Sequence, residues 1–116
     1  MTIAITYAVD ETPAVQNIRF VAGQDLSIAL TVTNTDGTVY DLTDCTATSE
    51  FVDPDTGTSD ALTVTTNTST GVITATLTDV ETAALGAVRR LWHVTLAGAV
   101  NRVLIRGVAI IEGHWG

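Results

Sequence analysis

Apolar residues alternate with small or polar residues along most of this chain, and turn residues interrupt the alternation at short intervals. In the clearest case, aliphatic side chains occupy every second position of one segment: Leu26, Ile28, Leu30 and Val32. Successive side chains of a strand point to opposite faces, so this period predicts a strand with one buried face. Several such segments, with turns every ~8–12 residues between them, are typical of a β-sandwich. We therefore predict an all-β, immunoglobulin-like β-sandwich of seven to eight short strands.

Turn chemistry refines the prediction after the strand at 26–32. The Asp36-Gly37 pair supplies the positive φ that a tight hairpin requires, and Val39 with Tyr40 is expected to begin the return strand. Leu42 follows directly, and we expect its side chain to plug the end of the core.

The last two predicted strands each contain an unusual residue. Trp92 opens the strand at 92–96, where we expect it to anchor the core, and Gly107 interrupts the ribbon at 103–111. A glycine inside a strand indicates a bulge or a close approach of another backbone segment. Cys45 is the single cysteine, so no intrachain disulfide forms, and we expect it to pack as a small apolar side chain.

One short helix is predicted near residues 79–85, where it would bridge the two sheets. Thr78 and Glu81 have the spacing of a capping box, and Gly86 offers a stop. Its apolar residues can face one side: Val80, Ala84 and Leu85. At 116 residues one core is enough, so we predict a single domain over 1–116, with 112–116 as a candidate extended tail.

The charge of the chain is strongly acidic and unevenly distributed. The formal net charge is -8, which argues against nucleic acid or an anionic membrane as a partner. Residues 1–82 contain twelve acids and one arginine, whereas residues 83–116 contain four arginines and one acid. All five basic residues are arginine, which fits either a compositional bias of the genome or the use of arginine at desolvated contacts.

Neither a membrane span nor an export signal is visible in the sequence. No run approaches the ~18 apolar residues of a spanning helix. The amino terminus lacks a basic region followed by an apolar stretch. We expect a protein made in the cytoplasm, with no membrane partner.

Residues with catalytic or metal-binding potential are few. His93 lies in a predicted strand and His114 in the tail, and neither belongs to a GxSxG or HExxH motif. We therefore expect no enzymatic activity, no cofactor and no metal. Trp115, also in the tail, either folds back over a sheet end or serves as an interface anchor.

A cluster of acids around Gly57 loosely resembles a calcium-binding loop. Its carboxylates are Asp53, Asp55 and Asp60. The EF-hand pattern places glycine at the sixth position and a glutamate at the twelfth, whereas here Gly57 is fifth and Val64 is twelfth. Turn formation explains these residues without a metal ion.

The order of several motifs resembles small β-sandwich virion proteins of tailed bacteriophages, in particular the amino-terminal domain of baseplate upper proteins. The matching motifs are GxDLxIxLTV at 23–32, DGTxYDLT at 36–43, GVITATLTxxETAAL at 71–85 and RxLIRG at 102–107. The resemblance covers roughly residues 20–111. Baseplate proteins of this kind normally carry a longer carboxy-terminal fibre or coiled-coil region, which this sequence does not contain.

The resemblance implies a structural role in a virion, bound to other virion proteins and present as a homo-oligomer or in many copies. Because the fibre region is missing, we expect a capsid decoration or cement protein bound to the major capsid protein. The alternative is a tail or baseplate adaptor. A carbohydrate-binding or adhesin-like module is a further alternative. The candidate contacts are Arg89, Arg90, Arg102, Arg106 and Trp115.

Overall fold

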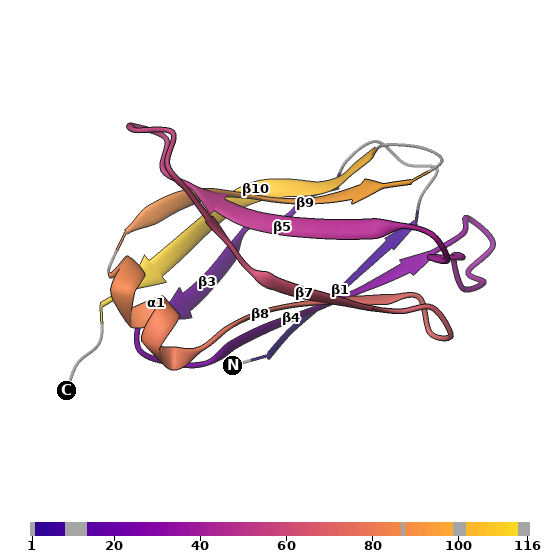
Figure 1. Cartoon of the computed structure of the whole chain (residues 1–116), viewed down its shortest axis with the longest axis horizontal. Coiled ribbons are helices and arrows are strands. Elements are labelled where there is room, and N and C mark those ends of the chain that lie inside the picture. The colour runs from indigo at the N-terminus through magenta and orange to yellow at the C-terminus, as the bar shows by residue number, and fades with distance from the viewer. Residues whose placement is uncertain (1, 9–13, 87, 99–101, 114–116) are drawn as a thin grey trace.

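Two β-sheets packed face to face form the body of the protein, and one helix lies at one end (Figure 1). The computed structural model describes residues 2–8, 14–86, 88–98 and 102–113. Within these residues the chain forms ten strands and a single helix, so the predicted all-β sandwich is confirmed. The strand count exceeds the prediction because two strands have only two and three residues. Trp115 and His114 lie outside the described residues.

The first sheet has four strands in the order β1-β4-β8-β7. They are β1 (Thr2–Ala8), β4 (Leu26–Thr33), β8 (Val72–Leu77) and β7 (Thr63–Asn67). β1 runs parallel to β4, and the other neighbours are antiparallel. Every inward-facing residue of β4 is buried, as its alternation predicted.

The second sheet has six strands, in which β10, β9, β5 and β6 lie side by side. They are β10 (Arg102–Glu112), β9 (Arg89–Ala97), β5 (Thr46–Val52) and β6 (Ser59–Ala61). Two short strands, β2 (Ala14–Val15) and β3 (Ile18–Val21), pair in parallel with the free edge of β10. The order of the main strands matches ABED and CFG of the immunoglobulin fold, with β5, β9 and β10 as C, F and G, except that β1 runs parallel to β4 and the second sheet has three further short strands.

Trp92 places a polar atom inside the core, and that atom has a hydrogen-bond partner. Trp92 is almost fully buried, and its indole N–H donates a hydrogen bond of 3.1 Å to Ser49 Oγ. Ser49 in turn donates to the carbonyl oxygen of His93. A buried donor of this kind costs free energy unless it is paired, so the Ser49 hydroxyl makes the tryptophan compatible with the core.

The turn after β4 forms as predicted, but the return strand does not. Gly37 N–H donates to the carbonyl oxygen of Asn34, and the chain then makes one isolated bridge between Thr33 and Val39. The prediction of a return strand was wrong because β1 and β8 already occupy the two edges of β4. Leu42 is buried at this end of the core, as expected.

The helix α1 (Asp79–Leu85) connects β8 of the first sheet to β9 of the second (Figure 1). The capping box of Thr78 and Glu81 is present. The orientation predicted for Val80 was wrong, because its side chain is 73% exposed whereas Thr82 is buried. The Thr82 hydroxyl accepts from Gly23 N–H at 3.0 Å and donates to the carbonyl oxygen of Gln24 at 2.7 Å. Thr82 therefore links the helix to the loop before β4 through two hydrogen bonds.

Replacing Thr82 by valine should lower the free energy of unfolding by about 2 kcal/mol. Valine keeps the volume of the side chain but removes the hydroxyl that accepts from Gly23 N–H and donates to Gln24, and a hydrogen bond of this kind contributes about 0.5–1.5 kcal/mol. Urea denaturation followed by tryptophan fluorescence measures the loss. Thr65→Val, at an exposed position of β7, is the matched control and should change stability by less than about 0.5 kcal/mol. Equal losses of stability in the two variants would contradict a stabilising role for the hydrogen bonds of Thr82.

Candidate partner-binding surface

The outward faces of the two sheets differ in chemistry. The outward positions of the four-stranded sheet carry only threonine, serine, alanine, valine and asparagine. Small and polar residues such as Thr46, Thr48 and Thr95 occupy one end of the outward side of the six-stranded sheet, whereas the rest of that side carries charged and large apolar side chains. We call this charged and apolar part of the surface the outer face, and its residues are Val15, Arg19, Val21, Glu50, Val52, Arg89, Leu91, His93, Arg106, Val108, Ile110 and Glu112.

Apolar residues of three strands form a row across the outer face. Val52 on β5 and Val108 on β10 both lie directly opposite Leu91 on β9. Leu91 is 47% exposed, and Val15 on β2 is 70% exposed. Directly opposed side chains on one face of a sheet contact each other, so the row is continuous.

Charged rows lie on both sides of this apolar row. On one side, Glu50, His93 and Arg106 lie opposite one another, and His93 Nε2 is 3.1 Å from Glu50 Oε1. On the other side, Arg89 and Arg19 flank Ile110. The outer face therefore has an apolar centre with charged side chains on both sides of it, together with Val15 and Ile110, and the register of the strands determines this order.

A shallow groove of about 400 Å³ crosses the outer face where β2 meets β10. Its walls include Val15, Leu91, Val108 and Arg106, and Gly107 forms part of its floor. The segment between β2 and β3 passes close to Gly107, because Gln16 N–H donates to the carbonyl oxygen of Arg106 at 3.0 Å. The close backbone approach predicted at Gly107 is confirmed.

The arginines predicted to bind a partner do not all lie on this face. Arg89 and Arg106 are exposed on it. Arg102 is half-buried at the first position of β10. Arg90 points to the inner side of β9, and its Nη1 lies 3.4 Å from Asp53 Oδ2. Arg19, which lies outside the basic carboxy-terminal third of the sequence, also lies on the outer face through the pairing of β3 with β10.

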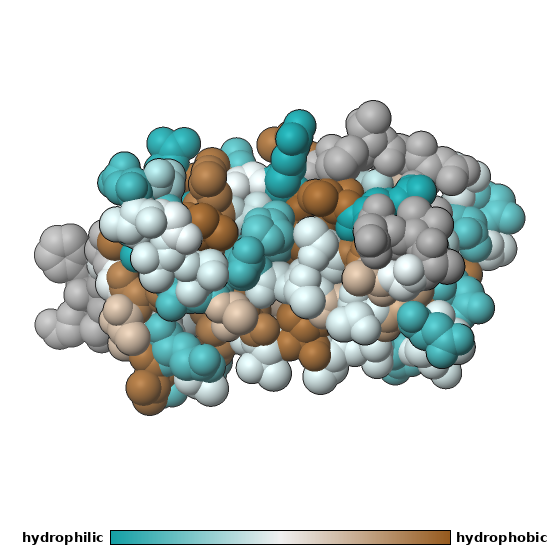
Figure 2. All heavy atoms as spheres, turned by 45° about the horizontal axis from the view of Figure 1, so that its top comes forward, coloured by the Kyte–Doolittle hydropathy of each residue, from teal (hydrophilic) through white to brown (hydrophobic). Residues whose placement is uncertain are grey.

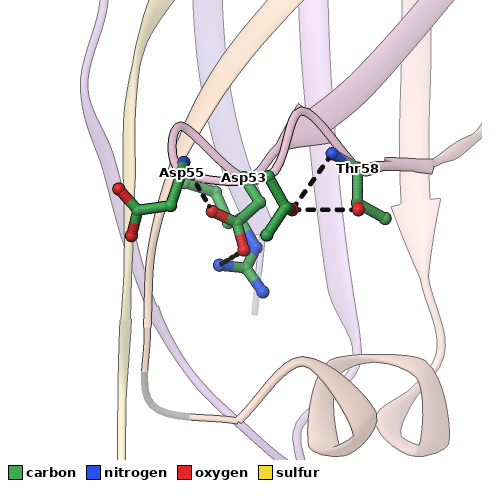
Figure 3. A network of polar contacts seen from close by, with 5 residues as sticks. Asp53, Asp55 and Thr58 are labelled. Carbon is green, nitrogen blue, oxygen red and sulfur yellow. Dashed lines mark hydrogen bonds and ion pairs between the residues drawn. The ribbon is translucent and has the colours of Figure 1, made fainter.

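The acidic loop at 53–58 is a hydrogen-bonded turn. Figure 3 shows Asp53 accepting a hydrogen bond of 2.8 Å from the backbone N–H of Asp55, beside the turn at Thr58. This hydrogen bond, followed in importance by those from Thr56 and by the charge of Arg90, lowers the pKa of Asp53 below its usual value. Within the described residues, no group of three or more histidine, cysteine or acidic side chains has an arrangement that could hold a metal ion.

The stability contributed by Asp53 should disappear in acid. Because the pKa of Asp53 is lower in the folded chain than its usual value of 3.8, its contribution is complete above 3.8. It is lost as the pH falls through the lower folded-state pKa. Asp53→Asn should therefore be less stable than the wild type at neutral pH, and this difference should shrink below pH 3.8 in urea titrations. Asp55→Asn, whose carboxylate is exposed, is the control; a difference that does not depend on pH would contradict the assignment.

No helical segment in the described part of the chain has the length and apolar character needed to cross a bilayer.

Comparison with known proteins identifies a fold. No model of a protein family matches the sequence, and no curated protein matches it. The structure is similar to the N-terminal domain of phage TP901-1 ORF48, with a TM-score of 0.60 and 11% identity over 97% of this chain and 99% of that chain. The bradyzoite-specific antigen BSR4 of Toxoplasma gondii aligns with a TM-score of 0.43 and 10% identity, over 95% of this chain and 48% of that chain. The chain thus shares its fold with an amino-terminal domain of a phage protein.

Proposed function

We propose that this chain is a structural protein of a tailed bacteriophage particle and acts as an adaptor in the tail or baseplate, where it binds other virion proteins. The fold likeness to the ORF48 domain supports this role, because it extends over almost the full length of both chains. The motif order in residues 20–111, which resembles the amino-terminal domain of baseplate upper proteins, points in the same direction. The two observations are of different kinds, since one rests on backbone geometry and the other on sequence.

The proposal includes the absence of catalysis. His93 pairs with Glu50 on an open sheet face, where a substrate would remain in contact with water. Most catalytic sites instead exclude water to strengthen their electrostatic interactions. The side chains of this surface are better suited to binding a protein than to transforming a small molecule.

The two alternatives from the sequence analysis rank lower. A capsid decoration role has no specific support from the compared structures, so the adaptor role now comes first. A carbohydrate-binding role needs exposed aromatic rings. Among the described residues, Tyr7, Trp92 and both phenylalanines are buried, and Tyr40 is half-buried.

Locating the protein in its particle tests the proposal. We expect mass spectrometry of purified particles to detect the chain, and a cryo-EM map to place its density at the tail or baseplate in several copies. Density on the capsid would support the decoration role instead. Absence of the chain from purified particles would refute a virion function of either kind.

A further inference from the structure

We infer that the outer face of the six-stranded sheet is the docking surface of this chain, and that its occupant is a protein surface that combines carboxylates with apolar side chains. This inference rests on the proposed function, because it specifies how the adaptor would bind another particle protein. Three properties of the outer face lead to it: its charge, its exposed apolar residues and the way its own carboxylates are used.

Positive charge is concentrated on the outer face of an otherwise acidic protein. The structure exposes three arginines, and all three lie here: Arg19, Arg89 and Arg106. The face has two carboxylates, Glu50 and Glu112, whereas the other described carboxylates lie in turns and loops, in β6 and at α1. The outer face therefore attracts acidic groups, although the whole chain carries a net charge of -8.

Apolar side chains occupy positions of the outer face at which polar ones are expected. An antiparallel sheet with one solvated face normally places polar residues outward. Here Val15 and Leu91 are 70% and 47% exposed, and Val52 and Val108 extend the row across three strands. Figure 2 views the molecule with this side turned forward and shows hydrophobic groups between hydrophilic ones. A groove with an apolar centre and an arginine rim has the arrangement of a protein interface.

The carboxylates of the outer face are already engaged, which decides against a second copy of the same face. Glu112 Oε1 lies 3.2 Å from Arg19 Nε, and Glu50 pairs with His93. In a face-to-face dimer, Arg89 and Arg106 of each copy would meet arginines and no free carboxylate of this face. Like charges brought together across an interface cost several kcal/mol. The arginines therefore require carboxylates that the outer face itself does not supply.

A pair of charge-matched variants tests the assignment. Arg89→Gln with Arg106→Gln removes two positive charges from the outer face, and Thr6→Glu with Thr65→Glu adds two negative charges to exposed positions of the other sheet. The probes are the separately purified tail and baseplate proteins of the same phage, immobilised for biolayer interferometry. We expect the arginine variant to weaken the binding by about tenfold or more, and the threonine variant to change it less than about twofold.

A third variant tests the apolar row. Leu91→Ser should also weaken the binding by about tenfold, because it removes the central exposed side chain of the row. Higher salt should slow the association of the wild type, and it should affect the arginine variant less. Circular dichroism and a thermal melt of each variant separate a loss of binding from a loss of folding.

The possible outcomes separate the two proposals. If the wild-type chain binds none of the tail and baseplate proteins, the adaptor function fails. If it binds one of them and the arginine variant binds equally well, the function stands and the outer face is the wrong surface. Sedimentation velocity that shows a wild-type oligomer dissolved by the arginine substitutions would identify a second copy as the occupant. Binding of duplex DNA lost in the same variant would overturn the assignment of a protein partner.

Discussion

Replacing Trp92 by alanine is expected to lower the free energy of unfolding by about 3–5 kcal/mol, the usual range for deleting a buried aromatic side chain. Trp92 is 1% exposed and lies on β9, between β5 and β10 in the second sheet. Its loss creates a cavity beneath the groove of the outer face. It also removes the indole donor from Ser49, whose hydroxyl is buried. Equilibrium urea denaturation followed by far-ultraviolet circular dichroism measures the change without relying on tryptophan fluorescence.

Two controls separate packing from hydrogen bonding at this site. Trp92→Phe keeps one six-membered ring and removes the N–H donor together with part of the packed volume, so we expect a loss clearly smaller than that of Trp92→Ala. Ser49→Ala leaves the indole N–H buried without this acceptor, and should cost about 1–3 kcal/mol. If Trp92→Ala were no more destabilising than Trp92→Phe, the ring would not be filling the core as its burial indicates.

The sequence predicted those parts of the fold that depend on neighbouring residues. The alternation at 26–32 located β4 and its buried face, and the capping box at Thr78 located α1. Leu42 and Gly107 also occupy the predicted environments. In each case a local property, such as period, cap or turn, determines the result.

Pairings between distant segments were not predictable in the same way. β1 and β8 lie on the two sides of β4, so the chain after Gly37 makes only one isolated bridge to it, and no residue near the turn encodes those two pairings. Thr82 resembles an ordinary polar helix residue in sequence. Its burial depends on Gly23 and Gln24, which are distant in the chain. Local sequence patterns therefore predict where strands and helix caps lie, but they do not predict which distant segments lie next to them.

The candidate surface was predicted only in part for the same reason. Arg89 and Arg106 were selected because the carboxy-terminal third is basic, whereas Arg19 reaches the outer face only through the pairing of β3 with β10. The sequence nevertheless contained one indication of this surface. Leu91 is an apolar residue at an outward position of a strand whose inward positions are Trp92, Val94 and Leu96. An apolar residue out of phase with the buried alternation marks a candidate contact.

Gly107 is a residue on which both the outer face and the fold depend. A Cβ added at Gly107 would overlap with the carbonyl oxygen of Gln16 and lie 2.7 Å from its carbonyl carbon. The obstacle is backbone, so it cannot rotate away as a flexible side chain would. We expect Gly107→Ala to lower the free energy of unfolding by about 3 kcal/mol, at the upper end of the cost of overpacking. Urea denaturation of the variant measures this loss.

Gly98→Ala is the matched control, because the added Cβ there would lie no closer than 3.2 Å to another atom and the backbone has no positive φ. It should cost clearly less than Gly107→Ala. A Gly107→Ala chain can relieve the overlap only by moving the Gln16 segment away from β10, and that segment carries Val15 and leads into Arg19. Partner binding should therefore fall even under conditions in which the variant remains folded. A variant with wild-type stability would show that the approach of Gln16 to Gly107 is looser than the hydrogen bond from Gln16 N–H to Arg106 implies.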